Sequence, residues 1–262
     1  MHPALWISKT GLEAQTTNLA VIANNLANAG TIGFKRDRVV FEDLFYQNFR
    51  QPGSQSSQDT RLPSGLQVGT GVKVVATQKQ HAQGGFQTSS SNLDMAIKGN
   101  GFFQIQMPDG TLGYTRAGNF STDENGQIVT AGNGYLLDPA ITIPNNVTGL
   151  DVAVDGTVSV QEQGSAAPTN IGNITLATFV NPAGLQSIGG NLYLETGSSG
   201  TATVGTPGLD GVGELLGGQL ETSNVSSVEE LVSLIETQRT YETNAKVLSA
   251  VDQMLQFVNQ TL

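Results

Sequence analysis

The chain has 262 residues, of which only 13% are charged and 32 are glycine, and its formal net charge is −10. It contains no cysteine, which excludes disulfide bonds and thiolate metal sites. No basic residue occurs between Arg116 and Arg239, and this acidic middle argues against binding of nucleic acid, because phosphate contacts depend on Lys and Arg.

The first predicted element is a helix over residues 4–28. Pro3 suits its first turn, and Asn28 and Gly30 favour its end. A leucine row at seven-residue spacing, two helical turns, lines one side of it: Leu5, Leu12, Leu19 and Leu26. Polar residues interrupt any signal-peptide core, so an exported chain is expected to use a route that does not cleave a standard signal.

Three asparagines close this helical segment, Asn24, Asn25 and Asn28. Polar residues at the end of an apolar heptad either fix the register of packed helices or serve only as capping and turn residues. Residues 35–49, which follow, fit either a short helix or an extended arm. The stretch from Gln51 through Gly71 is predicted to be a loop and linker.

From Gly71 onward the apolar period changes to two, as in β-strands. Turn signals separate alternating runs at residues 109–110, 123–126 and 155–156, and each predicts a hairpin. A further strand is expected at 174–180. The middle of the chain is therefore predicted to be an antiparallel β-domain.

The helical period returns near Asn224 and predicts one long helix over residues 225–262. Asn224 or Ser226 is expected to cap it. A helix this long exposes its apolar seam when alone in water, so the N-terminal helix or other subunits are expected to cover that seam. Its row again has seven-residue spacing: Leu234, Tyr241, Leu248, Leu255 and Leu262.

The sequence offers no recognisable catalytic, cofactor or metal site. Only His2 and His81 are present, and His81, in a polar stretch, is expected at the surface. Residues 123–126 faintly resemble a calcium loop, but the required glutamate is replaced by Gly134, so a turn is expected. We therefore expect no enzyme activity, cofactor or small-molecule substrate.

The rival interpretation, a stalked protein that binds or cleaves cell-wall glycan, needs an aromatic groove or a carboxylate pair within residues 95–220.

Four sequence blocks, in order, resemble the rod and hook axial proteins of the bacterial flagellum. They are NNLANAGTIGFK (24–35), LDMAIKGNGFFQI (93–105), YTRAGNFSTDENGQIVTAGNGYLL (114–137), and LETSNV (220–225) with QRTYETNAKVLSAVDQMLQ (238–256). The residues that carry the first motif are Asn24, Asn25, Asn28, Gly33 and Phe34. A segment at about 45–71 resembles an insert of the rod members that hook proteins lack.

The resemblance implies an α+β fold: long N- and C-terminal coiled-coil helices packed together, with a central antiparallel all-β domain inserted between them. Three parts are expected, namely an inner helical assembly domain (1–34 and 225–262), a connecting region (35–92) and an outer β-domain (93–224). The heptad residues named above are expected to supply self-assembly contacts. Stiffness is assigned to the insert, marked by Gln51, Pro52, Gly53, Leu62 and Pro63.

The resemblance further implies a structural rod subunit that self-assembles into a hollow, rigid helical shaft and transmits torque from motor to hook. Its expected partners are copies of itself, proximal rod proteins, hook or hook-junction subunits, the surrounding peptidoglycan and outer-membrane ring proteins, and the flagellar export apparatus. Its expected location is the periplasmic part of the basal body. Another axial protein, of the proximal rod or the hook, is the nearest alternative.

Overall fold

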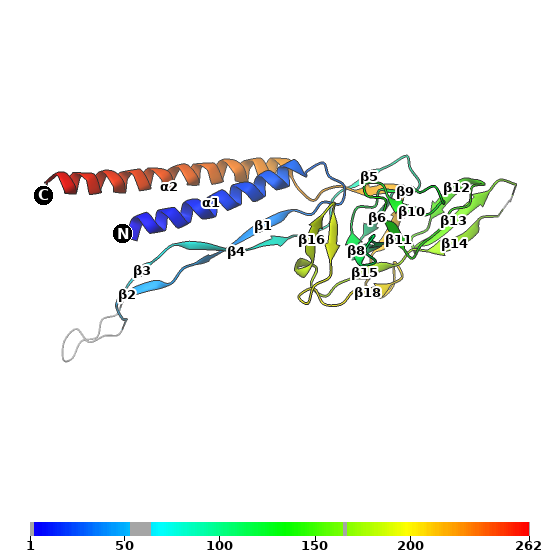
Figure 1. Ribbon diagram of the computed structural model, residues 1–262, viewed down its shortest axis with the longest axis horizontal. Helices are drawn as coiled ribbons and strands as arrows, with labels where there is room; N and C mark the ends of the chain where they lie inside the picture. Colours follow the sequence, from blue (N-terminus) through cyan, green and yellow to red (C-terminus); the bar gives the residue numbers. More distant parts are fainter. Residues whose placement is uncertain (1–2, 53–63, 165–166, 262) are drawn as a thin grey trace. The chain divides into compact units, whose positions relative to one another are not determined.

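The computed structural model describes residues 3–52, 64–164 and 167–261 (Figure 1). The chain divides into two compact units, the first made of residues 1–27, 37–78 and 226–262, and the second of residues 28–36 and 79–225. Terminal helices flank a central antiparallel β-structure, which confirms the predicted α+β class. None of the helices described is both long and apolar enough to cross a lipid bilayer.

Two long helices form the body of the first unit, α1 (Pro3–Ala27) and α2 (Ser227–Thr261). Asn18 donates a hydrogen bond to the Thr237 hydroxyl (3.1 Å), and a Cβ atom at Gly11 would lie 3.2 Å from the Asn244 amide nitrogen. A rise of seven residues along α1 is thus matched by a fall of seven along α2, so the helices pack antiparallel. The C-terminal end of α2 extends past the start of α1 (Figure 1).

Apart from the helices, the described residues of the first unit form two pairs of strands. β1 (Asp37–Asp43) pairs with β4 (Val72–Lys79), and β2 (Tyr46–Arg50) pairs with β3 (Leu66–Gly69). Residues 35–49 therefore adopt the extended alternative rather than the helix. The expectation that the whole stretch from Gln51 through Gly71 is loop is wrong at β3, because pairing with the aromatic-containing β2 satisfies the backbone of this polar sequence.

The second unit is a β-domain. Its main sheet has nine strands in the described residues, in the order β16-β17-β8-β7-β11-β10-β9, with β15 bound to β7 and β18 to β15. Smaller sheets are formed by β12-β13-β14, β19-β6 and β20-β5. The elements are β5 (Phe86–Thr88), β6 (Met95–Lys98), β7 (Phe102–Gln106), β8 (Leu112–Thr115), β9 (Phe120–Thr122), β10 (Ile128–Thr130), β11 (Leu136–Asp138), β12 (Val147–Val152), β13 (Thr157–Glu162), β14 (Thr169–Asn173), β15 (Leu176–Thr178), the 3-10 turn η1 (Pro182–Gly184), β16 (Gln186–Gly189), β17 (Leu192–Leu194), β18 (Thr203–Gly205), β19 (Glu214–Gly217) and β20 (Gln219–Glu221).

All three predicted hairpins form, as β7–β8, β9–β10 and β12–β13. The turn chemistry explains why. Asp109 accepts a hydrogen bond from the backbone N–H of Thr111 (3.1 Å), and Asp155 does the same for Thr157 (3.1 Å). Glycines at 110, 126 and 156 supply the positive φ angles that these turns require.

Two apolar clusters fill the second unit. The larger one packs strand residues that are fully buried, among them Met95, Ile97, Phe103, Leu176 and Leu215. The smaller one is aromatic and consists of Phe102, Tyr114, Ala177 and Tyr193, with Phe179 packed against it. These cores give the β-domain a hydrophobic interior of its own, which is what an independently folding unit needs.

Candidate functional site

The predicted leucine row of α1 lies beside the centre of the helix interface. Leu5, Leu12, Leu19 and Leu26 are all half-buried. Small and polar side chains dominate the fully buried positions, namely Ser8, Thr10, Ala14, Ile22 and Asn25. Within this set, Thr10 and Asn25 bind the backbone of Val72 and Asp37 in the strand ribbon, whereas Gly11 and Asn18 are the residues that contact α2. Part of the leucine surface is left open for contacts outside this chain.

Helix α2 carries apolar side chains on two opposite faces. Leu234, Leu248 and Leu255 of the predicted row are half-buried and Tyr241 is 40% exposed, while Leu262 lies outside the described residues. On the side roughly opposite the buried Thr237, the exposed fractions are 72% for Val228, 51% for Val232 and 49% for Ile235. A helix that is apolar on both faces is typical of one covered by two partners, and α1 covers only one face.

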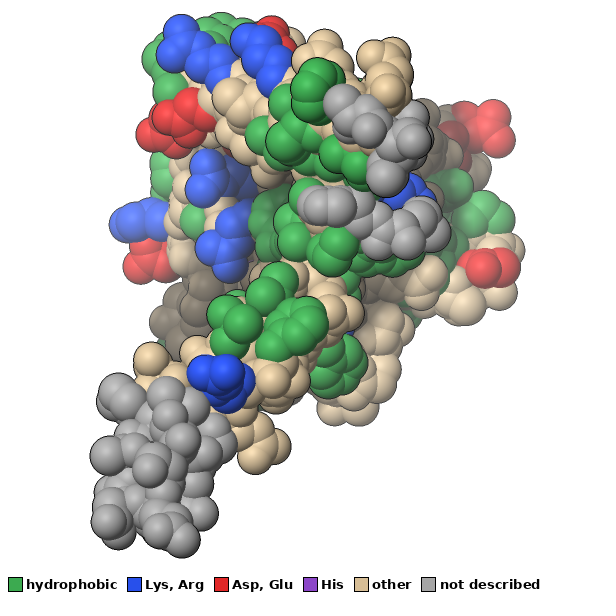
Figure 2. Space-filling view, turned by 90° about the vertical axis from the view of Figure 1, so that its left-hand side faces the viewer, with side chains coloured by type: hydrophobic (Ala, Val, Ile, Leu, Met, Phe, Trp, Pro, Cys, Tyr) green, Lys and Arg blue, Asp and Glu red, His purple; other side chains and the backbone are tan. Residues whose placement is uncertain are grey.

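The strand ribbon of the first unit is also poorly covered. Phe45 is 93% exposed, and the other exposed large side chains there are Phe41, Tyr46, Phe49, Leu66 and Val75. Figure 2, which looks at these elements from their free ends, shows hydrophobic side chains gathered there. Of the predicted insert residues, Gln51 and Pro52 are exposed next to the β2–β3 pair, and Gly53, Leu62 and Pro63 lie outside the described residues.

The motif asparagines have separate roles. Asn24 is exposed, and Asn28 accepts hydrogen bonds from Thr31 in the turn after α1. Asn25, only 2% exposed, accepts a hydrogen bond from the Asp37 N–H and donates one to the Asp37 carbonyl, both at 2.9 Å. Asn25 therefore neither fixes the register between helices nor caps a helix, because its partner is the backbone at the start of β1.

Two other residues of this motif, Gly33 and Phe34, are buried in the second unit. Gly33 has φ of +69°, and a Cβ atom there would lie 2.6 Å from the backbone nitrogen of Ala117, so glycine is required twice over. Phe34 lies beneath the ammonium of Lys79, 5.2 Å from the ring centre. Both residues therefore hold the segment that leads to Lys35.

A buried ionic triad occupies the second unit, formed by Lys35, Arg116 and Glu221. The Lys35 ammonium lies 2.7 Å from Glu221 Oε1, and Arg116 Nε lies 3.1 Å from Glu221 Oε2. The side chains of Lys35 and Glu221 are fully buried. Burial lowers the pKa of Lys35; the charge of Glu221 opposes this effect and that of Arg116 adds to it. The sequence signal for this triad is that each member lies inside one of the family-like blocks.

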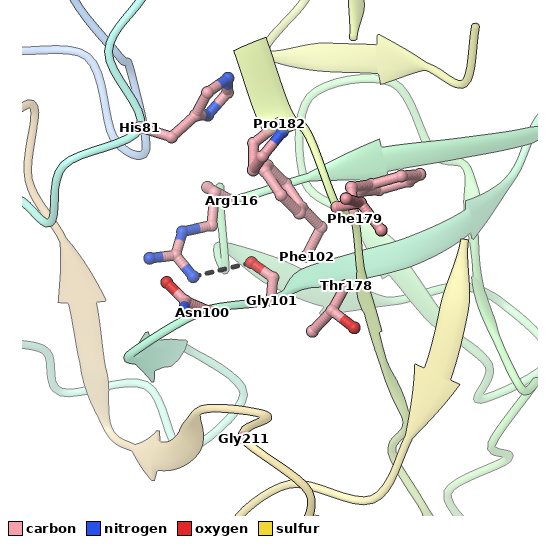
Figure 3. Close-up of a pocket in the computed structure, with 10 residues that line it drawn as sticks. His81, Asn100, Gly101, Phe102, Arg116, Thr178, Phe179, Pro182 and Gly211 are labelled. Carbon is pink, nitrogen blue, oxygen red and sulfur yellow. Dashed lines mark hydrogen bonds between the residues drawn. The ribbon is translucent and has the colours of Figure 1, made fainter. Parts of the chain in front are cut away.

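Backbone groups supply further partners for each member of the triad. Arg116 donates to the carbonyls of Gly101 (2.7 Å) and Gly99 (2.9 Å), and Figure 3 shows the first of these bonds beside a pocket of about 260 Å³. Lys35 donates to the Ala82 carbonyl, and Glu221 accepts from the Gly84 N–H. Since the Arg116 guanidinium is already engaged, this pocket does not offer it to an anionic ligand.

His81, expected at the surface, is half-buried. Its ring packs edge-on against Phe102 and Tyr193, with ring centres 5.5 Å apart in both cases, and it borders the pocket in Figure 3. Burial lowers its pKa to about 4, and the positive charges of Lys35, Arg116 and Lys79 act in the same direction. The polar neighbours of His81 in sequence hid these contacts, because both aromatic partners come from distant strands.

Of the two residues expected to cap α2, Asn224 does not; Ser226 directly precedes the helix, and its carbonyl accepts a hydrogen bond from the Glu230 N–H (3.0 Å). The Oδ1 of Asn224 accepts a hydrogen bond from the Arg36 N–H (2.8 Å), and its Nδ2 donates to the carbonyls of Gln80 (2.8 Å) and Ala82 (3.0 Å). The side-chain amide is therefore fully used within the second unit. Helix α2 begins three residues later, at Ser227.

The aromatic side chains that a glycan-binding groove would need are mostly in the core. Phe102, Phe103, Tyr114, Phe120 and Tyr193 are all buried. Among the described residues, no group of three or more His, Asp or Glu side chains is placed to hold a metal ion. Most of these aromatic side chains therefore serve as core, although Phe102 also lines the pocket in Figure 3 together with Phe179.

Comparison with known proteins agrees with the family-like blocks. Models described as "Flagella basal body rod protein", "Flagellar hook protein FlgE/F/G D1 domain" and "Flagellar basal body rod FlgEFG protein C-terminal" match residues 6–35, 96–160 and 216–261. Lys35, Arg116 and Glu221 each lie in a different one of these segments.

Full-length relatives carry the same description. "Flagellar basal-body rod protein FlgG" of Buchnera aphidicola subsp. Schizaphis graminum is 55% identical over 260 residues, which cover 99% of this chain and 100% of the relative. The protein of that name from Buchnera aphidicola subsp. Acyrthosiphon pisum is 53% identical over 260 residues, with the same coverage. That of Caulobacter vibrioides is 48% identical over 258 residues, covering 98% of each chain.

Removing the only anion of the triad should be far more damaging than removing an exposed one. Glu221→Gln leaves Lys35 and Arg116 buried together without a counter-charge, and we expect a loss of about 3–5 kcal/mol in the free energy of unfolding. Glu214→Gln, which breaks the exposed Lys98 pair (3.3 Å), is the matched control and should cost less than about 1 kcal/mol. Urea titration of both variants measures the difference, and equal losses would contradict the assignment.

The depressed pKa of His81 predicts a pH dependence. Between about pH 6.5 and pH 4 the unfolded chain binds a proton at His81 that the folded protein does not, so stability falls as the pH falls. This residue should account for a loss of about 2 kcal/mol between pH 7.5 and 5.0. Urea unfolding of the wild type and of His81→Gln at both pH values isolates this part, and identical pH dependence in the two proteins would refute it.

Proposed function

We propose, since this chain belongs to the flagellar basal-body rod protein family, that its first unit joins copies of the chain into the shaft of the flagellar distal rod. The protein is a structural subunit of that rod. The observation that carries the assembly role is the uncovered apolar face of α2, opposite the face that α1 covers. The half-buried heptad leucines and Tyr241 lie beside the α1–α2 contact and supply further apolar surface for packing against other copies.

The first unit has two separate apolar surfaces with which copies of the chain can make contact. The exposed apolar face of α2 and the exposed aromatics of the ribbon are two different surfaces. One neighbouring copy can therefore cover the first surface of a chain while another copy covers the second. Such head-to-tail contacts continue into an open helical filament unless the rotation closes a ring. A hollow shaft that transmits torque mechanically, with no catalytic step, is the function that this arrangement supports.

The individual partners that we propose follow from the position of the distal rod within the flagellum. At its two ends the shaft contacts proximal rod proteins and hook or hook-junction subunits, and its outer surface faces the peptidoglycan and outer-membrane rings. The chain reaches this periplasmic position through the flagellar export apparatus. The low charged fraction supports a surface that is largely covered by neighbours.

A charge on the uncovered face of α2 should block assembly without unfolding the chain. We expect Ile235→Lys to raise the concentration needed for polymerisation at least about tenfold, because a buried unpaired ammonium is costly. Gln238→Lys adds the same charge at an exposed polar position of the same helix and should assemble normally. Sedimentation of both proteins, with helix content checked by circular dichroism, measures this. Normal assembly of Ile235→Lys would count against the proposed face.

The insert should govern stiffness. Arg50 and Leu66 are cross-strand partners, so residues 51–65 can be replaced by an Asn-Gly turn that keeps β2 and β3 paired. We expect the polymer of this variant to form but to bend more easily, because contacts that resist sliding between subunits are lost. Bending stiffness is read from the contours of imaged filaments. A straight rod of unchanged stiffness would show that the insert has no such role.

A further inference from the structure

The chain passes from the second unit to the first at the Arg36–Asp37 peptide bond. On each side of this bond the backbone is held by the side-chain amide of an asparagine from another element of the chain. Asn224 binds the N–H of Arg36, and Asn25 binds both backbone groups of Asp37. Each of these contacts lies within a single unit.

Asn25 matches its partner group for group. Its Oδ1 accepts from the Asp37 N–H and its Nδ2 donates to the Asp37 carbonyl, which is the pattern that one strand residue offers another. Only an amide side chain combines an acceptor with donors in this arrangement; a carboxylate has no proton to donate. Asn25 is 2% exposed, so water does not compete for these bonds.

Asn224 gathers three chain segments next to the points where they leave the second unit. It binds Arg36, one residue from the boundary, and Gln80, which is two residues from the boundary between 78 and 79, and it lies itself two residues from the boundary between 225 and 226. Gln80 also donates its backbone N–H to the Arg36 carbonyl (2.9 Å), and the two side chains are hydrogen-bonded.

We propose that Asn25 and Asn224 are positioning residues that couple the two units mechanically. Asn224 holds three of the four connecting segments together at the second unit, and Asn25 anchors one of them to α1 in the first. Rotation of one unit is then passed on through segments fixed at their ends rather than through loose linkers. The use of this coupling in torque transmission rests on the proposed function; the restriction of motion between the units does not.

Distance measurements between the units test the coupling. The chain has no cysteine, so spin labels can be placed on cysteines introduced at Gln47 in the first unit and Thr148 in the second, both exposed. We expect Asn25→Ala and Asn224→Ala each to broaden the label-to-label distance distribution, on the order of twofold. The matched controls remove asparagine amides that bind away from the boundary: Asn18→Ala and Asn181→Ala should leave it unchanged.

Hydrogen exchange separates loss of coupling from unfolding. Exchange of the Arg36 amide should rise about tenfold in Asn224→Ala alone, and that of Asp37 in Asn25→Ala alone, with strand amides of the β-domain unaffected. If Asn224→Ala unfolds the second unit, Asn224→Asp replaces it, since the carboxylate still accepts from Arg36 but loses both donor bonds. Unchanged distance distributions in folded variants would overturn the proposal.

The same variants separate this proposal from the proposed function. If the wild type does not polymerise, the assembly role fails while the distance measurements on the single chain still decide the coupling. If the wild type and both variants polymerise, we expect larger twist fluctuations in filaments of the variants than in those of Asn18→Ala and Asn181→Ala. Equal fluctuations would overturn the link to torque.

Discussion

The constraint on which the rest of the structure depends is that α2 has more apolar surface than one partner helix can cover. Antiparallel packing on α1 covers one face of α2 and leaves Val228, Val232 and Ile235 exposed on the other. Burying apolar surface is the dominant favourable term in association, so such a face is stable only against another molecule. The β-domain, by contrast, has two hydrophobic cores of its own.

The second unit holds together chain segments that are far apart in sequence. Lys35, Arg116 and Glu221 come from its beginning, middle and end, and meet in a buried triad whose net charge is positive. Such a triad is costly to build and more costly to break, since every member loses its solvation on folding. Its residues therefore specify one arrangement of the chain ends, and Asn224 extends that arrangement to the neighbouring segments.

Periodicity and turn chemistry made much of the fold predictable. The ranges of α1 and α2 and all three hairpins followed from seven-residue spacing and Asp/Gly turns, which act locally. Prediction failed where the partners are distant: β3 depends on β2, His81 on Phe102 and Tyr193, and Asn224 on backbone at 36, 80 and 82. The triad is not predictable from local pattern either: the family-like blocks contain Lys35, Arg116 and Glu221, but nothing in the blocks shows that the three charges meet. Which copies contact the heptad residues stays a prediction, since a single chain contains only one side of that interface.

The most direct test of the central claim is hydroxyl-radical footprinting of the intact chain, as a dilute monomer and as a concentrated sample, with sedimentation to establish the state of each. We predict that the concentrated protein forms long polymers in which oxidation of Val228, Val232, Ile235 and Phe257 drops sharply, while exposed residues of the β-domain such as Val180 react as in the monomer. A concentrated protein that stays monomeric, or a polymer in which the α2 residues react as they do in the monomer, would contradict the account.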